Sequence, residues 1–291
     1  MTSDVLNDSK ISRLIEEALV EDIGLGDITT EAIIPTDTLG RGDILVKTRG
    51  VIAGLEVAGL VFQYVDPNVS LKTLVKDGTE VEQGMVVASA EGPCVSILKA
   101  ERTALNFLQR MSGIATLTRA FVKAVEGTRA KITDTRKTVP GFRILDKLAV
   151  EAGGGVNHRF GLDDMVLIKD NHIAVAGGIS AAIEKCLRFL RASNLNIKVE
   201  VETKNIDEVR EVLKHRGVSR IMLDNFPISD TRRAVQLINH AAETEASGNV
   251  SLENVRAIAE TGVDYISIGA LTHSPKALDI SLEIKEPISH P

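Results

Sequence analysis

Short apolar runs alternate with helical stretches over about 140 residues in the second half of the chain, and this alternation restricts the fold more than any other feature. The strand-like runs are KITDT, DMVLIK, IKVEVE, RIMLDN, AETEAS and YISIG. Such alternation is typical of βα units, in which helices cover a sheet of parallel strands. This number of units in so short a segment favours a small closed or nearly closed barrel, although a doubly wound sheet gives a similar pattern.

The first part of the chain has a different organisation. Apolar residues at helical spacing predict an opening helix over residues 10–21. Between residues 42 and 98, the β-like runs DILVKT, VSLKTLV, MVVASA and CVSIL surround one helix-like segment, LEVAGLVFQYV. This pattern predicts a small α+β domain. A long helical pattern over residues 101–125, in which Ser112 and Gly113 are candidate interruptions, places a domain boundary nearby.

Composition argues against several classes of partner. The chain of 291 residues has a net charge of -6 and a pI near 5.6, whereas nucleic acids and membrane surfaces favour a basic protein. No apolar run approaches the roughly 18 residues of a membrane span, and the opening MTSDVLNDSK has no apolar signal core. We therefore expect no nucleic-acid or membrane partner and a cytoplasmic location. Cys94 and Cys186 lack a metal-ligand spacing and are expected to be buried, inert thiols.

Polar or small residues follow every predicted strand of the second half. They are Asp134 to Lys137, Lys169 and Asp170, Glu202, Asp224 and Asn225, Ser247 to Asn249, and Gly269 to Leu271. In βα barrels the carboxyl ends of the strands converge on one mouth. A single charge at such a position is ordinarily a solvated loop residue, but a set that recurs at each strand end predicts a shared site.

The cationic residues near these strand ends predict a site for a small ligand with several anionic charges. They are Arg136, Lys137, Arg159 and Lys169, with His158 beside them. Arginine binds carboxylates and phosphates through two parallel hydrogen bonds, and lysine acts as a point charge. Glu202 and Asp224 form the acidic side of the same mouth. Their carboxylates are suited to binding sugar hydroxyls, holding a divalent cation or stabilising a developing positive charge, and the sequence does not rank these roles.

Two small-residue segments after the last two strands are candidates for phosphate binding. Ser247-Gly248-Asn249 and Gly269-Ala270 lie where barrels commonly bind phosphate through backbone N–H groups. His172 and His273, each a lone histidine, are interpreted as structural residues. Arg102 lies far from these motifs along the chain, and composition alone indicates a solvated or capping charge.

Lys169 has a rival role. Its place at the end of the apolar run MVLIK also suits the Schiff-base lysine of a lyase that acts on a sugar phosphate. Anion binding accounts for all four neighbouring cations, whereas a Schiff base accounts for one. A non-enzymatic alternative comes from VKDGTEVEQGMVVASAEG, which resembles lipoyl or biotinyl carrier domains. Such carriers present a modifiable lysine at a hairpin tip, and this stretch has no Met-Lys or Asp-Lys hairpin.

Eight segments, in the expected order from about residue 10 to residue 280, resemble the quinolinate phosphoribosyltransferase family, also called nicotinate-nucleotide pyrophosphorylase (carboxylating). They are EDIGLGDITT, ERTALNFLQRMSGIAT, TDTRKTVPGFR, DKLAVEAGGGVNHRFGLDDMVLIKDNH, VEVET, IMLDN, EASGN and TGVDYISIGALTHS. The resemblance implies an α/β protein with an N-terminal open-faced α+β sandwich (1–113) and an irregular, TIM-like α/β barrel (114–274). It also implies that a tail (275–291) returns to the first domain, and that a homodimer at least forms, with sites shared across its interface.

The resemblance further implies the reaction of quinolinate with phosphoribosyl pyrophosphate and Mg²⁺, which gives nicotinate mononucleotide, pyrophosphate and CO₂ in de novo NAD synthesis. Catalytic roles are then expected for Lys169, Glu202 and Asp224. The expected quinolinate-binding residues are Arg102, Arg136, His158, Arg159 and Lys169. Those for phosphoribosyl pyrophosphate are Thr135, Lys137, Glu202, Asp224, Ser247, Gly248, Asn249, Gly269, Ala270 and Leu271.

Two consequences follow from this resemblance. Arg102 is expected to reach the quinolinate site across the dimer interface, which replaces its interpretation as a solvated charge. Glu202 and Asp224 are expected to meet Mg²⁺ indirectly or through the substrate. The nearest enzymatic alternative is a phosphoribosyltransferase for nicotinate or another decarboxylated substrate, which needs fewer cations around the ring acid than this chain supplies.

Overall fold

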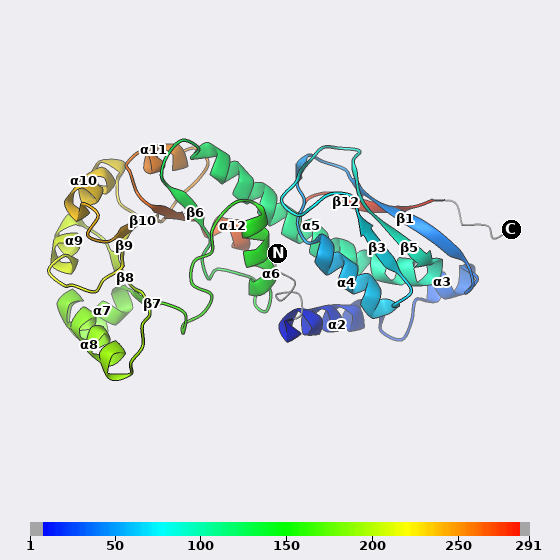
Figure 1. Cartoon of the computed structure of the whole chain (residues 1–291), viewed down its shortest axis with the longest axis horizontal. Coiled ribbons are helices and arrows are strands. Elements are labelled where there is room, and N and C mark those ends of the chain that lie inside the picture. Colours follow the sequence, from blue (N-terminus) through cyan, green and yellow to red (C-terminus); the bar gives the residue numbers. More distant parts are fainter. Residues whose placement is uncertain (1–7, 286–291) are drawn as a thin grey trace. The chain divides into compact units, whose positions relative to one another are not determined.

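The structure, a computed structural model, describes residues 8–285, which divide into two compact units (Figure 1). The first unit contains residues up to 119 together with 138–154 and the segment from 271 onward. The second contains residues 120–137 and 155–270. Each unit is therefore assembled from separate segments of the chain, and the expected boundary at residue 113 lies within one helix, α5 (Cys94–Ala124). Residues 286–291 of the expected tail lie outside the described residues.

A four-stranded antiparallel sheet organises the first unit. Its order is β12 (Ile280–Ile284), β1 (Leu39–Val46), β5 (Val86–Pro93) and β3 (Ser70–Thr73). Ile44 on β1 lies opposite Leu282 on one side and Ala88 on the other. β2 (Gly50–Val51) and β4 (Glu80–Val81) form a separate ladder. Because β12 pairs with β1, the C-terminal strand belongs to the sheet of the first unit.

Local signals define the shorter helices of this unit. They are α2 (Ser9–Ile23), α3 (Ile28–Ile33) and α4 (Leu55–Val65). Asp8 caps α2 by accepting a hydrogen bond from the Lys10 amide at 2.8 Å, and Gly24 ends it with a φ of +54°. Ile11, Ile15 and Leu19 form the buried stripe of this helix. The bounds of α4 coincide with the helix expected over LEVAGLVFQYV.

The expectation of a strand at CVSIL is wrong, because α5 begins at Cys94. Ile97, Ala100 and Ala104 are fully buried at helical spacing, so this segment continues the apolar stripe of the long helix. Ser112 and Gly113 do not interrupt the helix. A Cβ atom at Gly113 would collide with the carbonyl of Lys276, so glycine here allows the C-terminal segment to approach α5 closely.

A buried ion pair joins α5 to α6 (Arg143–Ala152) in the first unit. The Arg110 guanidinium donates two hydrogen bonds to Asp146, from Nε at 3.0 Å and Nη2 at 2.8 Å. The Asp146 side chain is fully buried, whereas that of Arg110 is 25% exposed. Arg110 also donates to the carbonyl of Thr272, in α12 (Ala270–His273), at 3.2 Å. Three segments that are distant in sequence therefore meet at one guanidinium.

Six parallel strands form the second unit. In spatial order they are β6 (Lys131–Thr133), β11 (Tyr265–Ser267), β10 (Glu243–Ser247), β9 (Arg220–Asp224), β8 (Val199–Thr203) and β7 (Val166–Ile168). The helices between them are α7 (Asp170–Ala176), α8 (Ile179–Ala192), α9 (Ile206–Val212), α10 (Ile228–Ile238) and α11 (Val255–Ala259). Figure 1 shows helices α8 to α11 in an arc outside these strands. The hydrogen-bonded ladder is not closed between β6 and β7. Val156 extends it beyond β6 by a bridge to Thr133. The barrel is therefore irregular.

The inward face of this sheet is unusually polar. Residues of β8 alternate between apolar and polar types, and alternate residues of a strand share one face. Glu200 is in register with Arg220, and the Arg220 guanidinium reaches Glu245 at 2.8 Å, so these charged side chains lie on the same face. The apolar residues between them, such as Val201 and Ile221, are almost fully buried. No described helix combines the length and apolar character needed to cross a membrane.

Candidate active site

The carboxyl ends of β7 to β10 bring four of the expected residues to one edge of the sheet. Asp224 and Ser247 end β9 and β10 as a register pair. Lys169 and Glu202 each follow one residue after the paired Ile168 and Val201. Because these strands are parallel neighbours, the four side chains belong to the same mouth, as their positions in sequence predict.

Lys169 and Glu202 interact directly at this mouth. The Lys169 ammonium lies 3.4 Å from a carboxylate oxygen of Glu202. The Lys169 side chain is 47% exposed and that of Glu202 is 11% exposed, so the lysine reaches solvent while the carboxylate is largely covered. His172 accepts a hydrogen bond from the Lys169 amide through Nδ1 at 3.0 Å, which helps to fix the start of α7. The arrangement offers a cation to an incoming ligand and keeps a carboxylate beside it.

Two arginines near β6 form a cationic pair. Arg136 follows β6, and Arg159 lies in the segment after the bridge at Val156. Burial lowers the pKa of the Arg159 guanidinium, and the nearby charge of Arg136 lowers it further. The charges of Glu200 and Asp164 act in the opposite direction but do not outweigh these effects. Arg159 donates from Nη1 to the Met165 carbonyl at 2.9 Å, and no carboxylate of the described residues forms an ion pair with it. Two neighbouring cations, one of them buried and outside any ion pair of residues 8–285, are the arrangement expected of a site for an anionic ligand.

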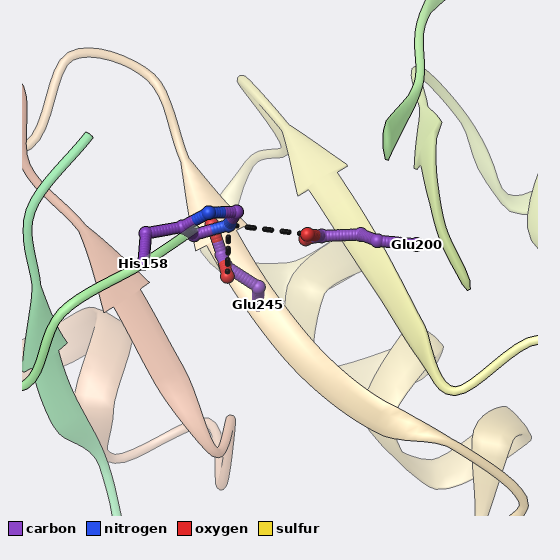
Figure 2. A group of neighbouring side chains, drawn as sticks. All are labelled: His158, Glu200 and Glu245. Carbon is purple, nitrogen blue, oxygen red and sulfur yellow. Dashed lines mark ion pairs between the residues drawn. The ribbon is translucent and has the colours of Figure 1, made fainter. Parts of the chain in front are cut away.

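His158 is turned toward the barrel interior (Figure 2). Its Nε2 lies 3.1 Å from Glu200 and 3.4 Å from Glu245, and its side chain is only 6% exposed. Burial alone lowers the pKa of His158, but hydrogen bonds and charges from the two carboxylates outweigh burial and raise it from 6.5 to about 9. His158 is expected to bind quinolinate, but in the structure its ring already faces two carboxylates of the protein.

The segment after β10 has the geometry of a loop for phosphate. Gly248 adopts a φ of +96°, and a Cβ atom there would collide with the side-chain amide of Asn225. That amide is held on both sides: Asn249 donates to its oxygen at 3.0 Å, and its nitrogen donates to Asp224 at 2.9 Å. Asn225 and Asn249 both have positive φ. The loop is therefore compact, and glycine at 248 leaves its backbone open to a ligand.

Other expected residues of the second unit lie at the same end of the strands. Thr135 and Lys137 follow β6, where the Lys137 amide donates to Thr135 Oγ1 at 3.1 Å. Gly269 and Ala270 follow β11, next to β6 in the sheet. The Ile268 amide donates to the Thr133 carbonyl at 2.9 Å, which keeps these two strand ends together.

Two expected residues belong to the first unit. Arg102 is exposed on α5, and Leu271 is fully buried at the start of α12. Neither cysteine is bonded to another: Cys94 is buried as expected, whereas Cys186 is only partly buried. Burial raises the pKa of both thiols.

A cavity of about 480 Å³ opens at the opposite, amino-terminal end of the barrel strands. Its lining includes Lys131, Lys198, Arg220 and Tyr265, together with His158 and Arg159. Lys198 and Arg220 both pair with Glu243, at 3.3 Å and 3.2 Å, so their charges are largely compensated within the protein. Because Arg159 lines this cavity and also neighbours Arg136, the cavity adjoins the cationic pair.

Sequence reasoning missed Glu200 and Glu245, which shape this site. It counted Asp134 and Asn225 among the polar residues after the strands but gave neither a role of its own. Asp134 is fully buried and accepts the His158 amide at 2.7 Å. The signal for Glu200 and Glu245 was present, because each lies two residues before an expected site position in the strands VEVET and ETEAS. Residues two apart face the same side, so an inward Glu202 implies an inward Glu200.

An α/β barrel whose strand ends carry cations, carboxylates and a compact glycine-containing loop is the arrangement of an enzyme that acts on small anionic, phosphate-bearing substrates. The comparisons specify the family. The family model for the N-terminal domain of quinolinate phosphoribosyl transferase matches residues 27–112, and the model for its C-terminal domain matches residues 114–283. The chain therefore belongs to the quinolinate phosphoribosyltransferase family.

Individual relatives agree with this assignment. The mitochondrial quinolinate phosphoribosyltransferase (decarboxylating) 2 of Nicotiana glauca is 48% identical over 289 residues, which cover 94% of this chain and 82% of that protein. The crystal structure of NadC from Streptococcus pyogenes superposes with a TM-score of 0.91 at 37% identity, covering 96% of this chain and 98% of that one. The nicotinate-nucleotide pyrophosphorylase of Francisella tularensis gives a TM-score of 0.88 at 39% identity, with 95% and 96% covered.

Proposed function

We propose that this chain transfers the phosphoribosyl group of phosphoribosyl pyrophosphate to quinolinate, forming nicotinate mononucleotide with release of pyrophosphate and CO₂, a step of de novo NAD synthesis. The observation that carries the proposal is the pair of neighbouring cations Arg136 and Arg159, of which Arg159 forms no ion pair within residues 8–285. Quinolinate has two adjacent carboxylates, so a pair of neighbouring arginines matches its charge. Lys169, half-exposed at the same mouth, supplies a further cation.

In this proposal the two ends of the second substrate meet different groups. Its 5-phosphate binds the backbone of Ser247, Gly248 and Asn249 and of Gly269, Ala270 and Leu271. Thr135 and Lys137 contact the phosphoribosyl group or its pyrophosphate. Departure of pyrophosphate leaves positive charge on the ribose, which Glu202 and Asp224 are placed to stabilise. Holding the pyridine nitrogen in line with the anomeric carbon contributes positioning, and no covalent enzyme nucleophile is needed.

Decarboxylation follows from the product's own chemistry. Once ribosylated, the ring is a pyridinium, which stabilises the electron pair left on the ring carbon when CO₂ departs. A proton from water then takes the place of the lost carboxylate and gives nicotinate mononucleotide. The protein's part is to hold the departing carboxylate among Arg136, Arg159 and Lys169 until ribosylation has occurred. His158 is assigned to the same substrate, although its ring faces Glu200 and Glu245.

Magnesium is proposed as the cofactor. Carboxylate oxygens are ligands that Mg²⁺ accepts, and Glu202 and Asp224 provide them at the mouth. Within residues 8–285, however, neither belongs to a group of three or more side chains close enough to enclose an ion. These residues therefore fit an ion held mainly by substrate phosphates and water, which they contact indirectly or through the substrate. When bound, Mg²⁺ neutralises charge on the leaving pyrophosphate.

The assembly and location are also proposals. We propose a homodimer in which Arg102 of one subunit contributes to the quinolinate site of the other, because Arg102 is exposed on α5 and available to a partner. The unbridged Cys94 and Cys186 are consistent with a reducing compartment, and we propose the cytoplasm. Localisation of a tagged chain checks the latter.

Two alternatives make different predictions. A nicotinate phosphoribosyltransferase binds a substrate with one carboxylate, so it would not need both Arg136 and Arg159 for the ring acid. A Schiff-base lyase needs Lys169 as a desolvated neutral amine, whereas the side chain is 47% exposed in an ion pair. Borohydride trapping in the presence of a sugar phosphate would label Lys169 only in the second case.

The deciding experiment incubates the purified protein with phosphoribosyl pyrophosphate, Mg²⁺ and either quinolinate or nicotinate, and follows nucleotide by chromatography and CO₂ in parallel. Nucleotide and CO₂ from quinolinate, with little product from nicotinate, support the proposal. Product from nicotinate alone would reject it. A folded Arg136→Ala variant that still uses quinolinate would reject the dicarboxylate assignment.

A further inference from the structure

One side chain sets the orientation of the Asp224 carboxylate. The amide nitrogen of Asn225 donates to Asp224 Oδ2 at 2.9 Å, and within residues 8–285 it is the one hydrogen-bond donor of this carboxylate. Asp224 is partly exposed, so without this bond its side chain would rotate among the orientations that the backbone allows. The use of Asp224 at the mouth therefore depends on where Asn225 lies.

The oxygen of the same amide reaches the loop after β10. The side-chain nitrogen of Asn249 donates to Asn225 Oδ1 at 3.0 Å. A carboxylate only accepts hydrogen bonds, so the amide nitrogen of Asn225 must face Asp224 and its oxygen must face Asn249. One planar amide therefore connects a carboxylate at the end of β9 to the loop at the end of β10.

The backbone of Asn225 is also tied to this loop. Its amide donates to the Ser247 carbonyl at 2.8 Å. Its φ of +55° lies in the left-handed region, which asparagine adopts at less cost than most residues. A Cβ atom at Gly248 would collide with the Asn225 side chain, so the loop packs directly against the amide. A movement of the loop must therefore displace Asn225.

A third asparagine, Asn254, fixes the other end of the loop. Its side-chain amide donates to the Asn249 carbonyl at 2.9 Å and accepts a hydrogen bond from the Ser251 amide at 2.9 Å. Asn254 directly precedes α11, so the main chain of Asn249 is tied to the start of that helix. The loop is therefore held between α11 and Asn225, and Asn225 is its connection to the end of β9.

We propose that Asn225 is a positioning residue, which couples the loop for the 5-phosphate of phosphoribosyl pyrophosphate to the carboxylate that faces the ribose. This inference rests on the proposed function, which assigns residues 247–249 to the phosphate and Asp224 to the ribose. Phosphate bound to the loop keeps Asn249 against Asn225, and Asn225 then holds Asp224 in the orientation that stabilises the ribosyl group. The 5-phosphate thus contributes to turnover as well as to binding.

Two substitutions separate the contacts of Asn225. Asn225→Gly tolerates the positive φ and removes both contacts. Asn225→Asp keeps an oxygen that accepts from Asn249, but it places a second carboxylate beside Asp224 where a donor stood. Asn194→Gly and Asn194→Asp are matched controls, because Asn194 is exposed and has a φ of +52°.

Steady-state kinetics with each substrate varied in turn test the role. Asn225→Gly should raise the KM for phosphoribosyl pyrophosphate about tenfold and lower kcat about tenfold, the effect of one hydrogen bond lost at each end, while the KM for quinolinate changes little. Asn225→Asp should lower kcat at least as far but raise the KM less, because Asn249 keeps its acceptor. Both Asn194 variants should match wild type. Folded Asn225 variants with wild-type kcat and KM would overturn the proposal, as would an equal rise in both KM values.

A second measurement keeps the coupling testable if the Asn225 variants do not fold or if the protein does not use quinolinate. In ¹H–¹⁵N NMR spectra, Asp224→Ala should shift the side-chain amide signals of both Asn225 and Asn249. In Asn225→Gly the same substitution should leave the Asn249 signal unmoved. A shift confined to Asn225 would overturn the proposal. Absence of product from quinolinate in the wild type, with both signals shifted by Asp224→Ala, would reject the proposed function and leave the coupling of loop and carboxylate in place.

Discussion

The ammonium of Lys169 lies 3.4 Å from the carboxylate of Glu202, at the ends of the neighbouring strands β7 and β8. The proposed function assigns the first to the acid groups of quinolinate and the second to the ribose. Their contact means that the two halves of the site adjoin within the barrel, at the place where the new bond must form. An anionic ligand that approaches Lys169 therefore competes with Glu202 for the same ammonium.

Lys169→Ala should remain folded but lose activity about a hundredfold or more, because the substitution removes both the cation that binds the ligand and the partner of Glu202. Steady-state turnover of quinolinate and a thermal melt measure the two effects separately. Lys185→Ala, on the outer helix α8, is the control and should keep full activity. Equal turnover in the two variants would remove Lys169 from the site.

Mixing two inactive variants tests whether subunits share a site. Arg102→Ala and Lys169→Ala alter residues that different subunits are proposed to contribute to one site. Neither variant homodimer therefore has an intact site. Random exchange of subunits should restore roughly a quarter of the sites, because half of the dimers are then mixed and each has one intact site of two. Activity is measured before and after incubation of the mixture. If the mixture stays inactive although native mass spectrometry detects mixed dimers, Arg102 does not act across the interface.

Alkaline pH should destabilise the fold through His158. Its pKa is raised from 6.5 to about 9, so the folded protein binds more protons than the unfolded chain between these values. The stabilising contribution is complete below pH 6.5 and is lost as the pH rises through 9. In Glu200→Gln one carboxylate fewer holds the proton, so the fall in Tm should begin at lower pH. Superimposable plots of Tm against pH for the two proteins would contradict this account.

The apolar runs predicted the barrel strands, because buried strands need apolar residues. The polar residues after those runs predicted which side chains lie at the carboxyl ends of the strands. CVSIL misled for the opposite reason: its β-favouring residues are buried on a helix, and tertiary packing overrides propensity. Glu200 and Glu245 look like solvated acids until the register places them inside the sheet. The two units combine segments that are distant in sequence, which no local pattern records.

Replacing Arg110 should cost more stability than its own exposure suggests. Asp146 is fully buried, so Arg110→Met leaves an uncompensated carboxylate, at a cost of about 3 kcal/mol at neutral pH. Burial already raises the pKa of Asp146 despite Arg110, and losing the arginine raises it further. The cost should therefore shrink toward acidic pH, where the carboxyl is protonated in both states. Glu17→Ala, which removes the exposed partner of Arg13, should cost much less in the same denaturant titrations.

Gly248→Ala should weaken the binding of phosphoribosyl pyrophosphate by distorting the loop after β10. The substitution has two costs, a side chain at a φ of +96° and a collision with the Asn225 amide. Gly127→Ala is a matched control, because its φ is +80° and no atom lies within 4 Å of the added Cβ. Both variants should lose about 1 kcal/mol to backbone strain.

Only Gly248→Ala displaces Asn225 from Asn249 and Asp224, so only this variant should raise the KM for phosphoribosyl pyrophosphate, by about tenfold, while the KM for quinolinate changes little. Thermal melts and kinetics with each substrate varied compare the two proteins. A similar phosphoribosyl pyrophosphate KM in both would show that the loop tolerates the collision or binds no phosphate. A rise in the KM for quinolinate alone would show that the loop does not bind phosphoribosyl pyrophosphate as proposed, because the phosphate and the dicarboxylate are proposed to bind different strand ends.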